Sequence, residues 1–274
     1  MSYSMLKAHR YLMLFPVAST TALILVLASF AFPIWHTGLA ETWLQSPESG
    51  MTQSEEITTY VLTFLFYFCN YFVIVFFNCA LVACVMQIME EGESSINFGL
   101  SFAMKRLHSI VGWALISAVV GMLLKALERQ KKLGAILAGL LGSAWTALTY
   151  FVVPVLVTDG VGPLEAFKRS TRTMKQTWGT ALMGNFSMGT MAFLIMLPVF
   201  LVAGGLIALA VRSGSDFMLV VAIVFSALAL ALALAATSTA DGIFKAYLYT
   251  YATGKALPEN VDTARFDEAF RPKD

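Results

Sequence analysis

The sequence predicts an all-α fold, a polytopic transmembrane bundle of six helices. Hydrophobic residues make up 58% of the 274 residues and charged residues only 13%, and the mean hydropathy is +0.74, which leaves too little polar surface for a soluble protein of this size. Windows without any charge, such as residues 57–89 and 178–211, are longer than the ~20 residues that cross a bilayer. The charged residues lie in the gaps between such windows.

Six spans follow one another along the chain. Within hydrocarbon, backbone N–H and C=O groups must pair inside their own segment, so each window is expected to be helical. These spans form one transmembrane domain over residues 1–254, followed by a short charged cytoplasmic tail at 255–274. The predicted spans are residues 16–35, 58–89, 109–124, 133–157, 181–211 and 217–240.

The third predicted span is short, and a basic cluster from Lys125 to Lys132 follows it. One explanation is a longer helix that starts near Ala103, from which Lys125 and Arg129 reach outward to the membrane surface. The alternative is a re-entrant hairpin formed by the third and fourth segments. The first explanation is favoured, because the fourth window has no charge and is long enough to cross the membrane alone.

The distribution of basic residues predicts the orientation. Loops rich in Lys and Arg are retained in the cytoplasm. With the N-terminus inside, thirteen of the 18 basic residues are cytoplasmic and five are outside, namely Lys125, Arg129, Lys131, Lys132 and Arg212. We therefore expect a multi-pass protein of the cell (inner) membrane with both termini in the cytoplasm.

An acidic residue followed by glycine closes each even-numbered span, and a basic amphipathic segment precedes each odd-numbered one. This pattern indicates three pseudo-repeated helical hairpins, each with a cytoplasmic interfacial helix. Chance alone also produces such a pattern, because glycine commonly follows a helix end. The three acidic-glycine pairs are Glu91-Gly92, Asp159-Gly160 and Asp241-Gly242.

The clearest interfacial helix is predicted at residues 162–178. Pro163 suits a first helical turn, and Glu165 complements the positive helix end. The apolar stripe consists of Leu164, Phe167, Thr171, Met174 and Trp178. Candidate contacts for anionic lipid headgroups at the cytoplasmic face are Lys168, Arg169, Arg172 and Lys175. The alternative is a helix that obeys the positive-inside rule and packs on the ends of the bundle.

Polar side chains within the spans are few. Hydrogen bonds between helices would account for them, whereas a cavity that they line together would indicate transport. None of them is ionisable, so proton coupling is not expected. The candidate intramembrane polar contacts are Asn70, Asn78, Asn185 and Thr237.

A row of small residues at a spacing of four marks the fourth span: Gly134, Ala138 and Gly142. Such rows let another helix approach closely. We expect the row to pack within the bundle, against the sixth span, or alternatively against a second copy of the chain.

No pattern in the sequence predicts catalysis or ligand binding. The three histidines, His9, His36 and His108, lie on separate segments near the membrane interfaces. None has a serine, cysteine or carboxylate at a spacing typical of a catalytic pair. We expect no catalytic residue, no cofactor, no metal site and no nucleic-acid partner. The expected partners are membrane lipids, with anionic headgroups at the cytoplasmic face, and other membrane proteins or the chain itself.

Four parts of the chain resemble an uncharacterised family of six-helix bacterial and archaeal integral membrane proteins. They are residues 14–16 with 27–30, residues 151–157, the run Gly-Pro-Leu-Glu-Ala-Phe-Lys-Arg-Ser at 162–170 with 177–179, and residues 247–254. More remotely, Ala166, Arg169 and Ser170 are similar to an interfacial helix of the membrane domains that accompany glycerophosphodiester phosphodiesterases. The resemblance implies a six-helix membrane fold and transfers no activity.

Together these features predict a non-enzymatic integral membrane protein that acts by interaction with lipids or membrane partners, in an organising, assembly or regulatory role. The alternative is a transporter, channel or lipid-moving protein, which an internal repeat would favour. An intramembrane enzyme ranks third. A hydrogen bond between His108 and a buried carboxylate beside a cleft would support that third hypothesis.

Overall fold

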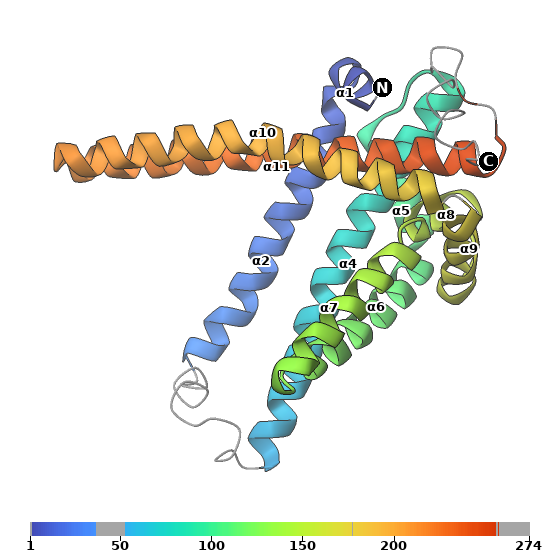
Figure 1. Cartoon of the computed structure of the whole chain (residues 1–274), viewed down its shortest axis with the longest axis horizontal. Coiled ribbons are helices and arrows are strands. Elements are labelled where there is room, and N and C mark those ends of the chain that lie inside the picture. The colour runs from blue at the N-terminus through green and yellow to red at the C-terminus, as the bar shows by residue number, and fades with distance from the viewer. Residues whose placement is uncertain (1, 37–52, 177, 256, 258–274) are drawn as a thin grey trace. The chain divides into compact units, whose positions relative to one another are not determined.

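The computed structural model describes residues 2–36, 53–176, 178–255 and 257, and within these ranges it leaves out the side chains of residues 33, 55, 131, 132 and 178–191. The described residues form helices and no strands (Figure 1). The α-helices are α1 (Ser2–Ala8), α2 (Leu14–His36), α4 (Gln53–Glu91), α5 (Ile96–Lys105), α6 (Leu107–Glu128), α7 (Lys131–Leu148), α8 (Val152–Thr158), α9 (Pro163–Gln176), α10 (Trp178–Ser213) and α11 (Asp216–Ala252), and a 3-10 helix, η1 (Arg10–Met13), joins α1 to α2.

In the described part of the chain, six helical stretches are long and apolar enough to cross a membrane, which confirms the predicted multi-pass, all-helical architecture. Each one overlaps a span predicted from the sequence. They are Arg10–His36, Glu56–Glu91, Leu107–Glu128, Leu133–Thr158, Ala192–Ser213 and Asp216–Ala252. The C-terminal tail predicted at 255–274 lies, beyond its first residues, outside the described part of the chain.

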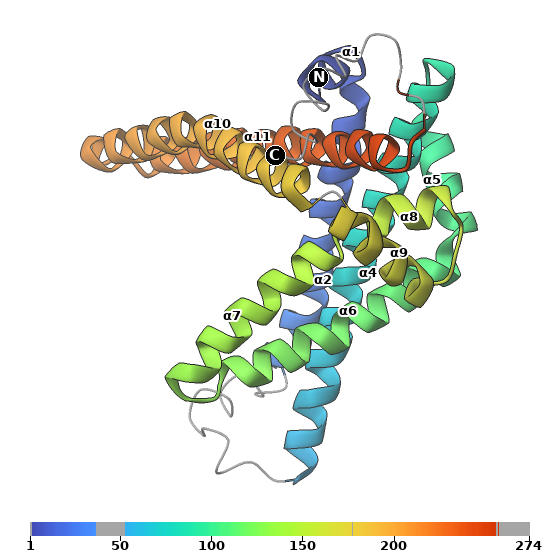
Figure 2. The ribbon, with the colours of Figure 1, turned by 45° about the vertical axis from the view of Figure 1, so that its right-hand side comes forward.

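The chain divides into two compact units. Unit 1 comprises Met1–Val17, Cys84–Ile96 and Arg172–Asp274, and unit 2 comprises Ala18–Ala83 and Asn97–Thr171. In unit 1, α10 and α11 pack side by side, and α1 and η1 pack against α11 (Figure 1). In unit 2, α6 and α7 form a helical hairpin (Figure 2).

The small-residue row of α7 lies in this α6–α7 hairpin. Ala138 is buried, and a Cβ added at Gly142 would lie 3.8 Å from Leu124 Cδ1 of α6. A Cβ added at Gly134 would collide with the Leu127 carbonyl. Within unit 2, the helix that the structure places beside the row is therefore α6, the nearest in sequence, and packing of the row against the sixth span, which belongs to unit 1, stays a prediction.

Two of the three acidic-glycine pairs end helices. Gly92 and Gly160 have φ values of 85° and 64°, the left-handed conformation that commonly closes a helix. Asp241-Gly242 instead lies inside α11, which continues to Ala252. The sixth helix is therefore longer than predicted, and the third element of the supposed repeat is not a helix end.

The third span is a helix of 22 residues, α6. At 1.5 Å per residue it is about 33 Å long, enough to cross the hydrocarbon core by itself. It extends the predicted span 109–124 at both ends, as the longer-helix explanation requires. It begins at Leu107 and not near Ala103, because the backbone leaves helical geometry at Arg106, between α5 and α6.

A short helix precedes each of three spans. α1 comes before α2, α5 before α6, and α9 before α10. These are the positions where the basic segments of the sequence predicted interfacial helices. Their location at the membrane surface stays a prediction.

Candidate functional site

The fourth span, predicted as one helix over 133–157, is interrupted between α7 and α8. The Ser170 hydroxyl of α9 donates to the Leu148 carbonyl at 2.7 Å and accepts from the Phe151 N–H at 3.1 Å. We call these contacts the hydroxyl bridge. Because Ser170 is 0% exposed, its hydroxyl takes the place of helix-internal hydrogen bonds in the absence of water.

Backbone bonds resume on both sides of this interruption. The Thr149 N–H reaches the Trp145 carbonyl at 3.0 Å, and the Val155 N–H reaches the Phe151 carbonyl at 3.0 Å. Pro154, in the first turn of α8, has no N–H that could bond to the Tyr150 carbonyl, and this absence contributes to the break in the helical hydrogen bonds. The hydroxyl bridge therefore forms hydrogen bonds with two backbone groups that an uninterrupted helix would pair internally.

A charge cluster holds the turn between α8 and α9. The Arg169 guanidinium forms ion pairs with Asp159 at 2.6 Å and with Glu165 at 3.1 Å. The hydrogen bond to Asp159, followed by the one to Glu165, raises the pKa of Arg169 above its ordinary value. Arg106, between α5 and α6, donates to the carbonyl of Gly160 in this turn at 3.4 Å. The charge of Arg169 is thus already matched within the chain.

Three stacked aromatic rings attach α9 to the α6–α7 hairpin. The ring centroids of Trp113 and Trp145 are 5.6 Å apart, and those of Trp145 and Phe167 are 5.5 Å apart, with interplanar angles of 9° and 22°. Pro163 packs so closely on α6 that a Cβ at Gly112 would lie 2.9 Å from its Cγ. These contacts, together with the hydroxyl bridge, fix which side of α9 faces the hairpin.

The opposite side of α9 presents a cation face, which we define as Lys168, Arg172 and Lys175. These residues recur at i, i+4 and i+7, so they share one side of the helix, and all three are exposed. None of the three forms an ion pair with a described residue. Because α9 crosses the division between the units after Thr171, the face is defined by helix periodicity alone.

One residue of the predicted apolar stripe lies elsewhere. Phe167 is in the aromatic stack and Met174 is buried, but Leu164 is 67% exposed, beside the cations. The buried side of the helix is centred on Ala166 and Ser170. Trp178 lies outside the described side chains.

Two of the candidate intramembrane polar residues form hydrogen bonds within their own helices. The Asn70 amide donates to the Phe66 carbonyl of its own helix at 2.7 Å, and the Thr237 hydroxyl donates to the Ala233 carbonyl at 2.9 Å. Asn78 is half-buried in α4, and the side chain of Asn185 lies outside the described residues. Since Asn70 and Thr237 bond within their own helices, they do not support the transport alternative.

His108 contacts a hydroxyl and not a carboxylate. Its Nε2 lies 3.1 Å from Oγ of the adjacent, fully buried Ser109. The hydrogen bond to a buried carboxylate that would support an intramembrane enzyme is thus not among the contacts of His108 in the described part of the chain. Among the described residues no group of three His, Cys, Asp or Glu side chains could hold a metal ion.

The sequence showed the cations of α9 but did not show which of them are paired. Asp159 and Arg169 are ten residues apart across a turn, so no helical spacing relates them. Ser170 likewise acts on backbone groups about twenty residues earlier. The stretch 162–170, already noted for its resemblance, was the one signal that could have pointed to these contacts.

The hydroxyl bridge, the aromatic stack and the cation face all lie within residues 57–257, which match the model of a family of unknown function, DUF6159. The chain belongs to the DUF6159 family. This match confirms the expected uncharacterised family and covers well over half of the chain. It does not show a bacterial or archaeal range, nor the remote similarity to phosphodiesterase-associated membrane domains. No curated protein and no solved structure matches this DUF6159 chain.

Proposed function

We propose that this DUF6159 protein is a non-enzymatic integral membrane protein that binds anionic lipid headgroups through the cation face of α9. The supporting observation is the division of charge on one helix. Arg169 is neutralised by Asp159 and Glu165, whereas Lys168, Arg172 and Lys175 have no ionic partner among the described residues. Such cations near an anionic membrane surface contribute about 1 kcal/mol each to attraction.

The position of α9 along the chain supports contact with headgroups. α9 begins five residues after the fourth candidate span ends at Thr158, and the chain then continues into α10. A helix so close to the end of a span lies near the headgroup layer. Exposed Leu164 beside the cations matches a helix that inserts an apolar residue among lipids while its cations remain at the surface.

The role we propose is to organise lipids, or to assemble with other membrane components or with a second copy, in the inner membrane. Both termini are cytoplasmic in this proposal, since thirteen of the 18 basic residues then lie inside. Anionic lipids are enriched in that leaflet.

Native mass spectrometry of the full chain in detergent, titrated with phosphatidylglycerol or phosphatidylcholine, tests this proposal. The variant K168Q/R172Q/K175Q is expected to raise the Kd for phosphatidylglycerol about tenfold or more and to leave binding of phosphatidylcholine unchanged, because it removes the unpaired cations of the site.

The matched control removes three cations elsewhere, in K125Q/R129Q/R212Q, and is expected to retain most of the affinity. Unchanged binding by the α9 variant would show that α9 only packs. Equal losses in both variants would show that net charge, and not the cation face, sets the affinity.

A further inference from the structure

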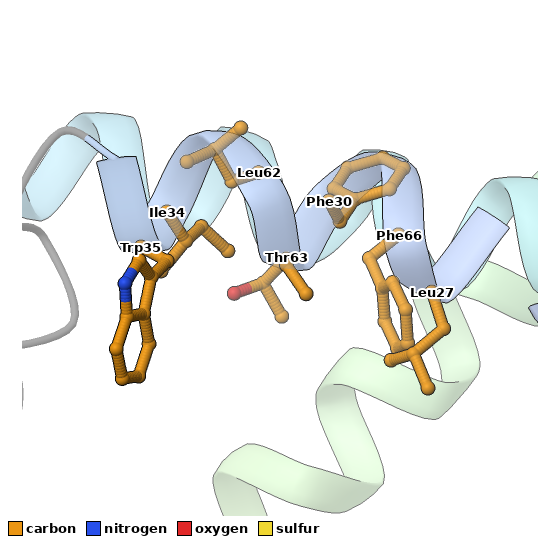
Figure 3. Close-up of a pocket in the computed structure, with 8 residues that line it drawn as sticks. Leu27, Phe30, Ile34, Trp35, Leu62, Thr63 and Phe66 are labelled. Atoms are coloured by element: carbon orange, nitrogen blue, oxygen red, sulfur yellow. The ribbon is translucent and has the colours of Figure 1, made fainter. Parts of the chain in front are cut away.

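An apolar groove runs between α2 and α4, within unit 2 (Figure 3). Its volume is about 410 Å³, and its walls come from residues 27–35 of α2 and 62–66 of α4. Nine consecutive residues of α2 rise about 12 Å, so the groove is elongated along the helices. Both walls belong to candidate membrane spans, which places the groove at the depth of lipid chains.

The groove has aliphatic and phenylalanine side chains at one end and a tryptophan at the other. Phe30 and Phe66 meet edge to face, with ring centroids 5.5 Å apart, beside Leu27. Trp35, 83% exposed, and Ile34 line the other end, and Thr63 lies between the two ends (Figure 3). Tryptophan is enriched where hydrocarbon meets headgroups, so the Trp35 end is the membrane-surface end.

The Thr63 hydroxyl differs from other threonine hydroxyls of the spans. Thr58, Thr237 and Thr239 each donate to the carbonyl four residues earlier, at 2.7, 2.9 and 2.6 Å. Thr63 has no such bond with a described residue, and its oxygen lies on the Trp35 side of the groove (Figure 3). A hydroxyl in hydrocarbon without a partner is costly, so this position favours a ligand that brings an acceptor.

We infer that the α2–α4 groove binds one acyl chain of an ester phospholipid, with its hydrocarbon between Leu27, Phe30 and Phe66 and its ester carbonyl accepting a hydrogen bond from Thr63. The elongated shape and the depth in the membrane match an acyl chain, and the unpaired Thr63 hydroxyl, which points toward the surface end, matches its ester carbonyl. The site lies where α2 ends and α4 begins, in the leaflet next to the α2–α4 connection. The groove is independent of the cation face, which we propose to bind anionic headgroups next to the fourth span.

Photo-crosslinking in nanodiscs tests the inference. The full chain is reconstituted with phosphatidylcholine that has a diazirine in one acyl chain, and crosslinked peptides are mapped by mass spectrometry. Crosslinks are expected within residues 27–35 and 62–66. Ala31→Phe, which fills the groove, is expected to reduce them about tenfold or more, whereas Ala28→Phe, the same change on α2 outside the lining residues, is expected to retain them.

A second variant tests the hydrogen bond separately. Thr63→Val keeps the shape of the side chain and removes the donor, so crosslinking of the ester lipid is expected to fall about fivefold, the equivalent of one ordinary hydrogen bond. Equal crosslinking in Ala31→Phe and Ala28→Phe would overturn the site. Preferential labelling by a diazirine fatty acid would overturn the phospholipid assignment.

Discussion

Replacing Ser170 with alanine is expected to destabilise the protein by about 2–6 kcal/mol. The Phe151 N–H and the Leu148 carbonyl both lose their bond to the Ser170 hydroxyl, at a site where Ser170 is fully buried. Leaving a buried polar backbone group without a partner costs about 1–3 kcal/mol. Unfolding in mixed micelles, followed by near-ultraviolet circular dichroism, measures the difference.

The next residue provides the control. The Thr171 hydroxyl is also buried but has no hydrogen-bond partner among the described residues. Thr171→Val keeps the shape and removes an unsatisfied group, so its stability is expected to equal or slightly exceed that of the parent. If Ser170→Ala proved as mild as Thr171→Val, the hydroxyl bridge would have no stabilising role.

Truncation of Trp113 to alanine is expected to cost about 3–5 kcal/mol and to loosen α9. Trp113 is 4% exposed and stacks with Trp145 and Phe167, so its removal leaves a cavity where α6, α7 and α9 meet. The same titration gives the loss of stability. Limited trypsin digestion reports α9 separately, because faster cleavage after Lys168 is expected once the stack is lost.

Trp35→Ala is the comparison for this substitution. Trp35 is exposed at the end of α2, and truncation of an exposed side chain is expected to change stability by no more than about 0.5 kcal/mol. Similar losses from both substitutions, or an unchanged cleavage rate after Lys168 in Trp113→Ala, would contradict the role assigned to the stack.

The sequence was sufficient to predict the six membrane-length helices, because hydropathy windows report the composition of each segment directly. It was insufficient where a distant contact decides the local backbone. The break between α7 and α8 depends on Ser170, and continuation through Asp241-Gly242 is supported by the Asp241–Lys245 ion pair one turn on, at 2.7 Å. The mean hydropathy of a sequence window contains no information on either interaction.

The candidate sites were predictable to different degrees. Periodicity alone placed Lys168, Arg172 and Lys175 on one side of α9, but it also grouped Arg169 with them, since its pairing with Asp159 is tertiary. The α2–α4 groove had no sequence signal at all. Leucine and phenylalanine in a span have the same pattern whether they pack against protein or line an open space, and only the separation of the two helices distinguishes these cases.

The hydroxyl bridge sets an order of events in biogenesis. Ser170 is synthesised about twenty residues after the backbone groups that it satisfies, when residues 149–151 have already entered the ribosomal exit tunnel. The Leu148 carbonyl and the Phe151 N–H therefore depend on a later part of the chain, because Pro154 prevents an uninterrupted helix from pairing every backbone group in its place. The hydrogen bonds at this break can therefore form only after α9 has been synthesised, so the fourth span and the helix that follows it reach their final structure together.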